Sequence, residues 1–302
     1  MAIITQSDQS VSALFKAYRE LMKLRIVALL VFTCITAMFV AAAGRPDALK
    51  LLATVVGGVL SAGGASALNQ FLDRDMDAKM KRTAHRPIPS GRITPINALL
   101  FGIGLVAWSV LILGLFVNWL AAALALGGAI YYVVLYTVLL KRNTVANIVI
   151  GGGAGAMPVL VGWAAVTGTL SIEAFLLFAI VFYWTPPHSW ALALMVNKDY
   201  AAVGVPMMPV ARGPETTHWQ ILFYSVQLVL VSLLPAGALL VPGVEFMGLF
   251  YLISAVLLGV RLLYLCVLLI QRANKPTARR LYKYSSMYLL FLFLAMIIDS
   301  LL

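Results

Sequence analysis

Nine apolar runs, each long enough to cross a membrane, divide this chain from residue 26 to its end. A helix needs roughly 20 predominantly apolar residues to span a bilayer. The runs lie near residues 26–43, 51–72, 96–116, 119–140, 145–166, 172–196, 221–240, 246–270 and 281–302. Backbone groups inside a bilayer must form their hydrogen bonds within the segment, so each run is predicted to be an α-helix. The chain is therefore expected to be an all-α integral membrane protein, a bundle of nine transmembrane helices.

The composition agrees with this fold class and argues against a second folded domain. Hydrophobic residues make up 62% of the 302 residues and charged residues only 11%, whereas soluble domains carry roughly 25% charged residues. No long polar stretch could fold by itself. We therefore expect two parts, a polar N-terminal segment at residues 1–25 and one membrane domain at residues 26–302.

The positive charges predict how the chain is oriented in the membrane. Lys and Arg gather at residues 1–25 and in the loops 73–95, 141–142, 197–217 and 271–283, which successive crossings place on one side. By the positive-inside rule this side is cytoplasmic, which puts the N-terminus inside and the C-terminus outside. The same distribution accounts for the net charge of +11 without nucleic acid as a partner.

A polar stretch between the second and third runs, residues 69–92, holds three of the eleven acidic residues. Asn69, Asp73 and Asp77 are spaced four apart, so a continuing helix places all three on one face, and Asp75 points away from it. Their carboxylate and amide oxygens suit Mg²⁺, which proteins usually hold with one or two carboxylates and the phosphates of a substrate. The stretch therefore predicts a metal–diphosphate site at the membrane surface.

Basic residues accompany these acids on the same side of the membrane. Lys81, Arg82 and Arg86 follow at once, and Lys141 and Arg142 end the fourth run. Such cations suit phosphate oxygens. The alternative is an ordinary cytoplasmic loop whose basic residues only set the topology, but topology does not require three acids at this spacing.

The loop at residues 197–217 is the second long cytoplasmic loop, with Asp199, Arg212 and Glu215 in it. Loops of roughly twenty residues in a compact protein are usually functional. Because both long loops face the cytoplasm, one mouth of the bundle can collect two acidic clusters and several cations.

His188 is an ionisable residue inside the sixth run, directly after Pro186 and Pro187. An ionisable residue at membrane depth is costly and indicates a functional site by default. It could bind iron, accept a proton or form an interhelical hydrogen bond, the last worth roughly 1 kcal/mol. The nearby Trp184 and Trp190 either form an interfacial aromatic belt or line a pocket for an aromatic ligand.

Glycine is frequent in the fifth run, which contains Gly151, Gly152, Gly153 and Gly155. Small residues allow helices to approach closely. The absent side chains could equally make room for a bulky, flat ligand, and the sequence leaves both interpretations open.

Together these residues resemble the UbiA-type superfamily of intramembrane prenyltransferases, over residues 20–295. The pattern N-x-x-x-D-x-x-x-D at Asn69, Asp73 and Asp77, followed by R-T-x-x-R-P at residues 82–87, is its first aspartate-rich motif. Within the superfamily the chain is most similar to the branch that farnesylates haem. The features that support this branch are Gln70, the run 136–165, W-x-P-P-H at residues 184–188, and D-Y…P-M at Asp199, Tyr200, Pro206 and Met207.

The resemblance implies nine helices around a central cavity, in the bacterial inner (plasma) membrane. It implies transfer of a farnesyl group from farnesyl diphosphate to a vinyl group of haem b, with Mg²⁺ as the metal and haem O and diphosphate as products. Haem b is then a substrate, not a permanent cofactor. Membrane lipid surrounds the enzyme, and a haem A synthase or terminal oxidase assembly factors are the candidate downstream partners.

The spacing, the charges and the depth of His188, together with the resemblance, predict roles for individual residues. The expected catalytic and metal-binding residues are Asn69, Asp73, Asp77 and Asp199; those expected to bind diphosphate are Lys81, Arg82, Arg86, Lys141 and Arg142; His188 is expected to contact haem. Many relatives carry a further carboxylate four residues before the position of Asp199, where this chain has Met195. This departure argues against a second metal site built on a pair of carboxylates.

Three other functions are consistent with parts of the sequence. A secondary transporter explains glycine-rich, proline-containing helices, but the acids here lie at the cytoplasmic ends of the runs and not at mid-membrane. A phosphatidyl-group transferase needs a D-G-x-x-A-R pattern, which is absent. The remaining alternative is another UbiA-type prenyltransferase that acts on a quinone precursor or a tetrapyrrole.

Overall fold

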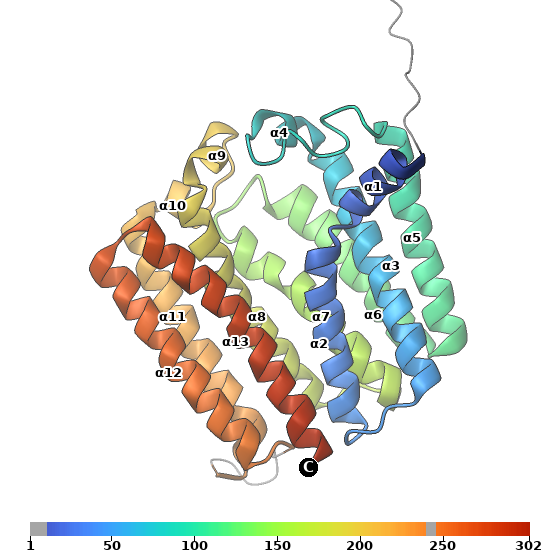
Figure 1. The fold of residues 1–302 in the computed structure, drawn as a ribbon, viewed down its shortest axis with the longest axis vertical. Coiled ribbons are helices and arrows are strands. Elements are labelled where there is room, and N and C mark those ends of the chain that lie inside the picture. Colours follow the sequence, from blue (N-terminus) through green and yellow to red (C-terminus); the bar gives the residue numbers. More distant parts are fainter. Residues whose placement is uncertain (1–10, 240–245) are drawn as a thin grey trace, which may run out of the picture.

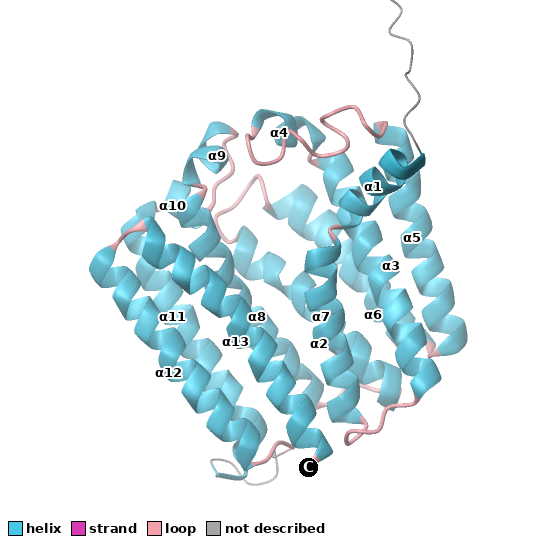
Figure 2. Cartoon of the chain, in the orientation of Figure 1, coloured by secondary structure: helices cyan, strands magenta, loops and turns pink. Residues whose placement is uncertain are grey.

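The computed structural model describes residues 11–239 and 246–302, and these residues form only helices and connecting loops (Figure 2). The elements are α1 (Val11–Met22), α2 (Leu24–Ala41), α3 (Ala48–Leu72), α4 (Arg74–Lys79), α5 (Pro95–Phe116), α6 (Trp119–Ile130), η1 (Tyr131–Leu140), α7 (Asn147–Thr167), α8 (Ile172–Met195), α9 (Asn197–Ala202), α10 (Met208–Ala211), α11 (Gly213–Leu233), η2 (Leu234–Leu239), α12 (Leu249–Arg272) and α13 (Lys275–Leu301). The predicted all-α class is confirmed.

Eight segments in the described chain are long and apolar enough to cross a membrane, which confirms a multi-pass protein. Helix α8 is the remaining long helix. Its 24 residues are enough to span, but the polar Thr185 and His188 and the two adjacent prolines make it less apolar. Counting α8, the structure agrees with the nine predicted runs.

Helix ends differ from the predicted runs mainly on the polar side of the bundle. Helix α11 begins at Gly213, before its predicted start at residue 221. Helix α13 begins at Lys275, six residues before its own predicted start. Asn274 caps α13 by accepting a hydrogen bond from the backbone N–H of Thr277 at 2.9 Å, which fixes its start. Part of the predicted 197–217 loop is thus helical, as α9, α10 and the start of α11. Hydropathy cannot show these polar turns because they extend beyond the apolar run.

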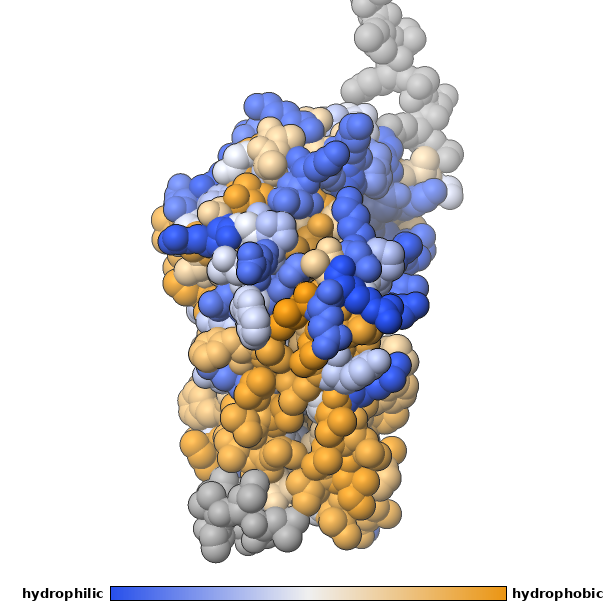
Figure 3. Space-filling model, turned by 90° about the vertical axis from the view of Figure 1, so that its left-hand side faces the viewer, coloured by the Kyte–Doolittle hydropathy of each residue, from blue (hydrophilic) through white to orange (hydrophobic). Residues whose placement is uncertain are grey.

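The predicted N-terminal segment also contains a helix, α1, which packs against α3 and α2. Residues 1–10 of that segment lie outside the described residues. Helices α2, α3 and α5–α7 form one group and α8 and α11–α13 the other, and contacts of α8 with α7 and of α13 with α2 join the two (Figure 1). Polar side chains gather at the end that carries α4 and α9, above an apolar belt (Figure 3). The central cavity stays a prediction.

Close helix packing occupies the space beside three of the α7 glycines. A Cβ added to Gly151 would meet the ring of Tyr136 at 2.3 Å, one on Gly153 would meet the Tyr131 hydroxyl at 2.8 Å, and one on Gly152 would meet Thr185 at 3.0 Å. For these three positions the packing interpretation holds, since side chains of η1 and α8 already fill the space that a flat ligand needs.

Candidate active site

The predicted acidic cluster forms at the polar end of α3. Helix α3 ends at Leu72, yet helical bonding continues: the N–H of Asp73 donates to Asn69 O at 2.9 Å, and the N–H of Asp77 donates to Asp73 O at 2.8 Å. Asn69, Asp73 and Asp77 are therefore on one face, with exposed fractions of 3%, 0% and 2%. Asp75 points away and is 62% exposed, as the spacing predicts.

Residues from three separate segments meet at Asn69 and Asp73. The Asn69 amide donates to Asp73 Oδ2 at 2.8 Å and to Thr137 Oγ1 at 3.1 Å, and its oxygen accepts from Lys23 Nζ at 3.1 Å. Lys141 Nζ donates to Asp73 Oδ2. Asn69 thus binds the carboxylate of Asp73, which also accepts from Lys141, while its own oxygen accepts from Lys23.

The other two acids also pair with cations. Arg86 Nη1 donates to Asp77 Oδ2 at 2.6 Å. Arg142 donates to both oxygens of Asp75 at 3.0 Å and lies 3.5 Å from Asp73 Oδ1. The hydrogen bonds from Arg142 lower the pKa of the Asp75 carboxyl to about 2. Of the predicted cations, Arg86, Lys141 and Arg142 join the cluster, whereas Lys81 and Arg82 are exposed and have no ion pair among the described residues.

Lys23 is a member of this cluster that the sequence did not single out. It separates α1 from α2 and adopts the left-handed conformation, with φ of 51°, which is uncommon for a residue other than glycine. Burial, together with the nearby Arg86 and Lys141, lowers the pKa of its ammonium to about 7, although Asp77 and Asp73 act in the opposite direction. Lys23, Arg86 and Lys141 are close enough to repel one another, and a bound polyanion would reduce this repulsion.

Thr137 and Lys141 reach the cluster from a π-helix, η1. Its backbone bonding runs five residues back, as where the Lys141 N–H donates to Tyr136 O at 2.8 Å. The side-chain hydroxyl of Thr137 also donates to Tyr132 O, at 2.8 Å. A π-helix turns less per residue than an α-helix, so residues four and five apart share a face. Tyr132, Tyr136, Thr137 and Lys141 can thus face one side. Such helices are rare and frequent at functional sites.

The donor set fits a hard divalent cation that completes its coordination from a ligand. Asp73 Oδ1 is buried and accepts no hydrogen bond within the described part of the chain. Among the described residues no group of three or more His, Cys, Asp or Glu could hold a metal alone. One or two carboxylates with an amide oxygen match the way Mg²⁺ is bound together with phosphates.

Helix α9 brings the second acidic segment to the same end of the bundle (Figure 1). Asp199 lies in its first turn, and its side chain makes no ion pair with another described residue. Burial raises the pKa of the adjacent Tyr200, which Arg82 and Arg86 oppose and Asp199 and Asp73 reinforce. The segment around Asp199 is therefore within electrostatic reach of the acidic cluster, without direct contact.

His188 lies two turns from the polar end of α8, in contact with α13. Its Nδ1 is 2.8 Å from Ser285 Oγ. Its ring stacks between Trp184, at 4.3 Å, and Tyr282, at 4.6 Å between centroids. The interhelical hydrogen bond considered from the sequence is thus present at Nδ1, and Nε2 makes none with any residue the structure describes.

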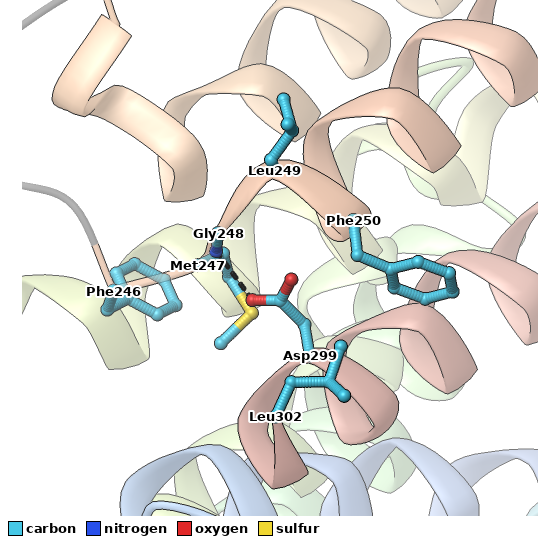
Figure 4. Close-up of a pocket in the computed structure, with 7 residues that line it drawn as sticks. All are labelled: Phe246, Met247, Gly248, Leu249, Phe250, Asp299 and Leu302. Carbon is cyan, nitrogen blue, oxygen red and sulfur yellow. Dashed lines mark hydrogen bonds between the residues drawn. The ribbon is translucent and has the colours of Figure 1, made fainter.

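A pocket lies at the opposite end of the bundle, away from the acidic cluster (Figure 4). Phe246–Phe250, Asp299 and Leu302 line its open volume of about 480 Å³. Both oxygens of Asp299 accept backbone N–H groups, from Gly248 and from Tyr251, and so cap the start of α12. With its oxygens bound to the backbone, Asp299 joins α13 to α12, and it makes no ion pair with any residue in the described ranges.

Known proteins resemble this chain over most of its length. The profile described as the UbiA prenyltransferase family matches residues 30–295. A protein of Roseiflexus sp. (strain RS-1) named protoheme IX farnesyltransferase is 49% identical over 95% of this chain and 53% of its own length. The chain thus spans about half the length of the first relatives it matches. A protein of the same name from Synechocystis sp. (strain PCC 6803) is 48% identical over 99% of this chain and 93% of its own length.

A solved structure shares the fold. It is described as a UbiA homolog from Archaeoglobus fulgidus bound to DMAPP and Mg²⁺, with a TM-score of 0.68 and 16% identity, over 93% of this chain and 99% of that one. At this identity the likeness concerns the fold alone. The family match and the shared fold therefore agree with each other.

Proposed function

Because the chain belongs to the UbiA prenyltransferase family, we propose that it transfers a farnesyl group from farnesyl diphosphate to a vinyl group of haem b, forming haem O and releasing diphosphate. The relatives named protoheme IX farnesyltransferase, at 48–49% identity, support this choice of acceptor. The observation that carries it in the structure is the buried pair Asp73 and Asp77 at the polar end of the bundle, surrounded by four cations from three segments.

Asn69, Asp73 and Asp77 are the residues that hold Mg²⁺ in this proposal. When bound, Mg²⁺ neutralises charge on the diphosphate and so favours its departure. Asp73 Oδ1, which accepts no hydrogen bond from the described residues, is the oxygen most ready to bind it. Asp199 contributes from α9 as a single further carboxylate, since Met195 cannot supply its pair.

The cations bind the diphosphate. Lys23, Arg86 and Lys141 now contact Asn69, Asp77 and Asp73, and short rotations of these side chains carry their N–H groups to phosphate oxygens. Lys81, Arg82 and Arg142 supply further charge from the exposed side. Preorganised cations at the place where charge develops stabilise the transition state without reorganisation.

Bond changes in the proposed reaction balance as follows. The C–O bond between farnesyl and diphosphate breaks, and the oxygen keeps the electron pair. The terminal carbon of a haem vinyl group bonds to the resulting allylic cation, water adds to the other vinyl carbon, and a proton is released. The apolar bundle limits the access of water to the cation until the vinyl group has attacked.

His188 contacts the haem in this proposal, and its partial exposure within α8 leaves Nε2 able to do so. The chain acts as one membrane domain over residues 26–302, after an N-terminal segment at residues 1–25. The N-terminus is cytoplasmic and the C-terminus outside, in a bacterial inner membrane. The product passes to a haem A synthase or to terminal oxidase assembly factors.

A product assay tests the proposal. Purified protein in lipid nanodiscs is given farnesyl diphosphate and Mg²⁺ with either haem b or a hydroxybenzoate, and products are identified by mass. We expect farnesylated, hydrated haem and no prenylated hydroxybenzoate. Prenylated hydroxybenzoate as the main product would instead assign the chain to the quinone-pathway branch of the family.

A further inference from the structure

His188 is held more rigidly than a simple interhelical contact requires. Trp184 and Tyr282 stack on its two ring faces, with interplanar angles of 21° and 29°. The Trp184 indole N–H donates to the backbone oxygen of Ser285 at 2.6 Å, which joins α8 to α13 at this level. The ring cannot rotate between these aromatic faces without displacing one of them, so the environment of each ring nitrogen is fixed.

The hydrogen bonds of Ser285 favour one position for the proton on the ring of His188. A serine hydroxyl has one proton to donate and can accept at its oxygen. The Ser285 hydroxyl donates to the Tyr282 carbonyl at 2.9 Å, so toward His188 Nδ1, at 2.8 Å, it can only accept. Nδ1 must then carry the proton. In the opposite arrangement Ser285 gives its proton to Nδ1 and loses its bond to Tyr282. Ser285 is 1% exposed, and a buried hydrogen bond left unmade is costly.

We infer that Ser285 is a positioning residue that holds His188 as the Nδ1–H tautomer, so that Nε2 offers its lone pair to the iron of haem b. The inference rests on the proposed contact of His188 with haem. A neutral imidazole binds a metal through its unprotonated nitrogen. Histidines that bind metals generally donate their other N–H to a fixed acceptor, which sets the tautomer and raises the basicity of the ligating nitrogen. Ser285 is such an acceptor.

Nitrogen NMR tests the tautomer without any substitution. The chain has three histidines, His85, His188 and His218, so histidine labelled with nitrogen-15 gives few signals, and a His188→Gln variant assigns the one of interest. We expect wild-type protein at neutral pH to show a protonated Nδ1 and an unprotonated Nε2 at His188. A proton on Nε2 would overturn the inference.

Haem binding tests the consequence with a matched pair of serines. Ser286 is the neighbour of Ser285, and its hydroxyl approaches Tyr282 O at 3.4 Å but does not bond to His188. Loss of an outer partner of a metal-binding histidine weakens metal binding about 10–100-fold. We expect Ser285→Ala to bind haem b at least about ten-fold more weakly, with a changed absorption spectrum of the iron, and Ser286→Ala to match wild type.

A third variant, His188→Ala, separates this inference from the proposed haem contact. If His188→Ala binds haem b with the wild-type affinity and spectrum, the proposed contact is wrong and the inference falls with it. If His188→Ala changes both but Ser285→Ala changes neither, the contact stands and only the role of Ser285 is overturned. Should Ser285→Ala fail to fold, the NMR measurement on wild-type protein still decides the tautomer.

Discussion

Each carboxylate of the cluster already lies beside a cation, and this pairing is what makes the site ready for a charged substrate. A buried carboxylate is tolerated only when it is paired and hydrogen-bonded, and Asp73 and Asp77 meet that condition through Lys141 and Arg86. The same cations are then in place when a diphosphate enters. Binding therefore exchanges one set of ion pairs for another and does not require bare charges to be buried.

Asp77 and Asp75 provide a matched test of the one-face arrangement. Both pair with an arginine, but Asp77 is buried and Asp75 is exposed. Removing one electrostatic stabiliser of a transition state typically costs about 100-fold or more in turnover. We expect Asp77→Asn to lose farnesyl transfer by at least that factor and Asp75→Asn to lose only a few-fold, both measured as kcat/KM for the donor. Equal losses would show that Asp75 also faces the substrate.

Lys23 is expected to bind the donor although its position also satisfies the positive-inside rule. A hydrogen bond to a charged group contributes about 1.5–3 kcal/mol, so Lys23→Met should weaken farnesyl diphosphate binding roughly ten-fold or more and leave haem binding unchanged. Lys16→Met is the control, because Lys16 is an exposed cation of α1, the helix directly before Lys23. If both variants bind the donor equally well, Lys23 has only a topological role.

At the scale of elements, the π-helix η1 is the feature that connects the fourth membrane span to the chemistry. The winding of η1 brings Thr137, and Lys141 at its end, into contact with the acidic cluster. In an α-helix both residues would point away from the face that carries Tyr132. Tyr132 and Tyr136 stack at 5.5 Å on this same element. The irregular winding therefore positions side chains for the site and is not a defect of the span.

Removing one residue from η1 should restore α-helical winding and turn Lys141 away from Asp73. Val134 suits this deletion because it is exposed on η1. We expect deletion of Val134 to abolish donor binding, while Val134→Ala, which keeps the chain length, binds normally. Binding of farnesyl diphosphate to the purified, folded proteins checks this. Unchanged binding in the deletion variant would mean that the π-helix does not set the position of Lys141.

Much of the fold and part of the site follow from the sequence, for separate reasons. The spans are local properties of composition, so their positions are recovered to within a few residues except where α11 and α13 extend into polar sequence. The spacing of Asn69, Asp73 and Asp77 is also local, and their shared face is confirmed. Lys23, Thr137 and Ser285 act through partners 46, 68 and 97 residues away. In the sequence each of these three looks like any other polar residue near a span, so no local pattern predicts its role.

For the whole molecule, the proposed topology predicts that the polar end of the bundle faces the cytoplasm. The polar end carries α4 and α9 with the acidic cluster (Figures 1 and 3). Water-soluble farnesyl diphosphate would then enter from the cytoplasm. At the opposite end of the bundle, Asp299 caps the start of α12.

Cysteine labelling in cells tests this orientation. Both native cysteines, Cys34 and Cys266, are buried, so single exposed cysteines can be introduced with little background. We expect Thr169→Cys, in the loop after α7, to react with a membrane-impermeant maleimide in intact cells. Ala84→Cys, in the loop after α4, should react only after the membrane is opened. The reverse pattern would place the acidic cluster outside and contradict the assigned topology.

Donor binding at Asp73 is the most direct measurement of the central claim, that this cluster holds a prenyl diphosphate through a divalent metal and the surrounding cations. Farnesyl thiodiphosphate, which ionises poorly, is titrated into purified wild-type protein and the Asp73→Asn variant, with Mg²⁺ or with EDTA. We predict tight binding only for wild-type protein with Mg²⁺, and binding weakened roughly 100-fold in the other three cases, as expected when an interaction of about 2.7 kcal/mol is lost. Equal affinity in EDTA, or in Asp73→Asn, would contradict the account.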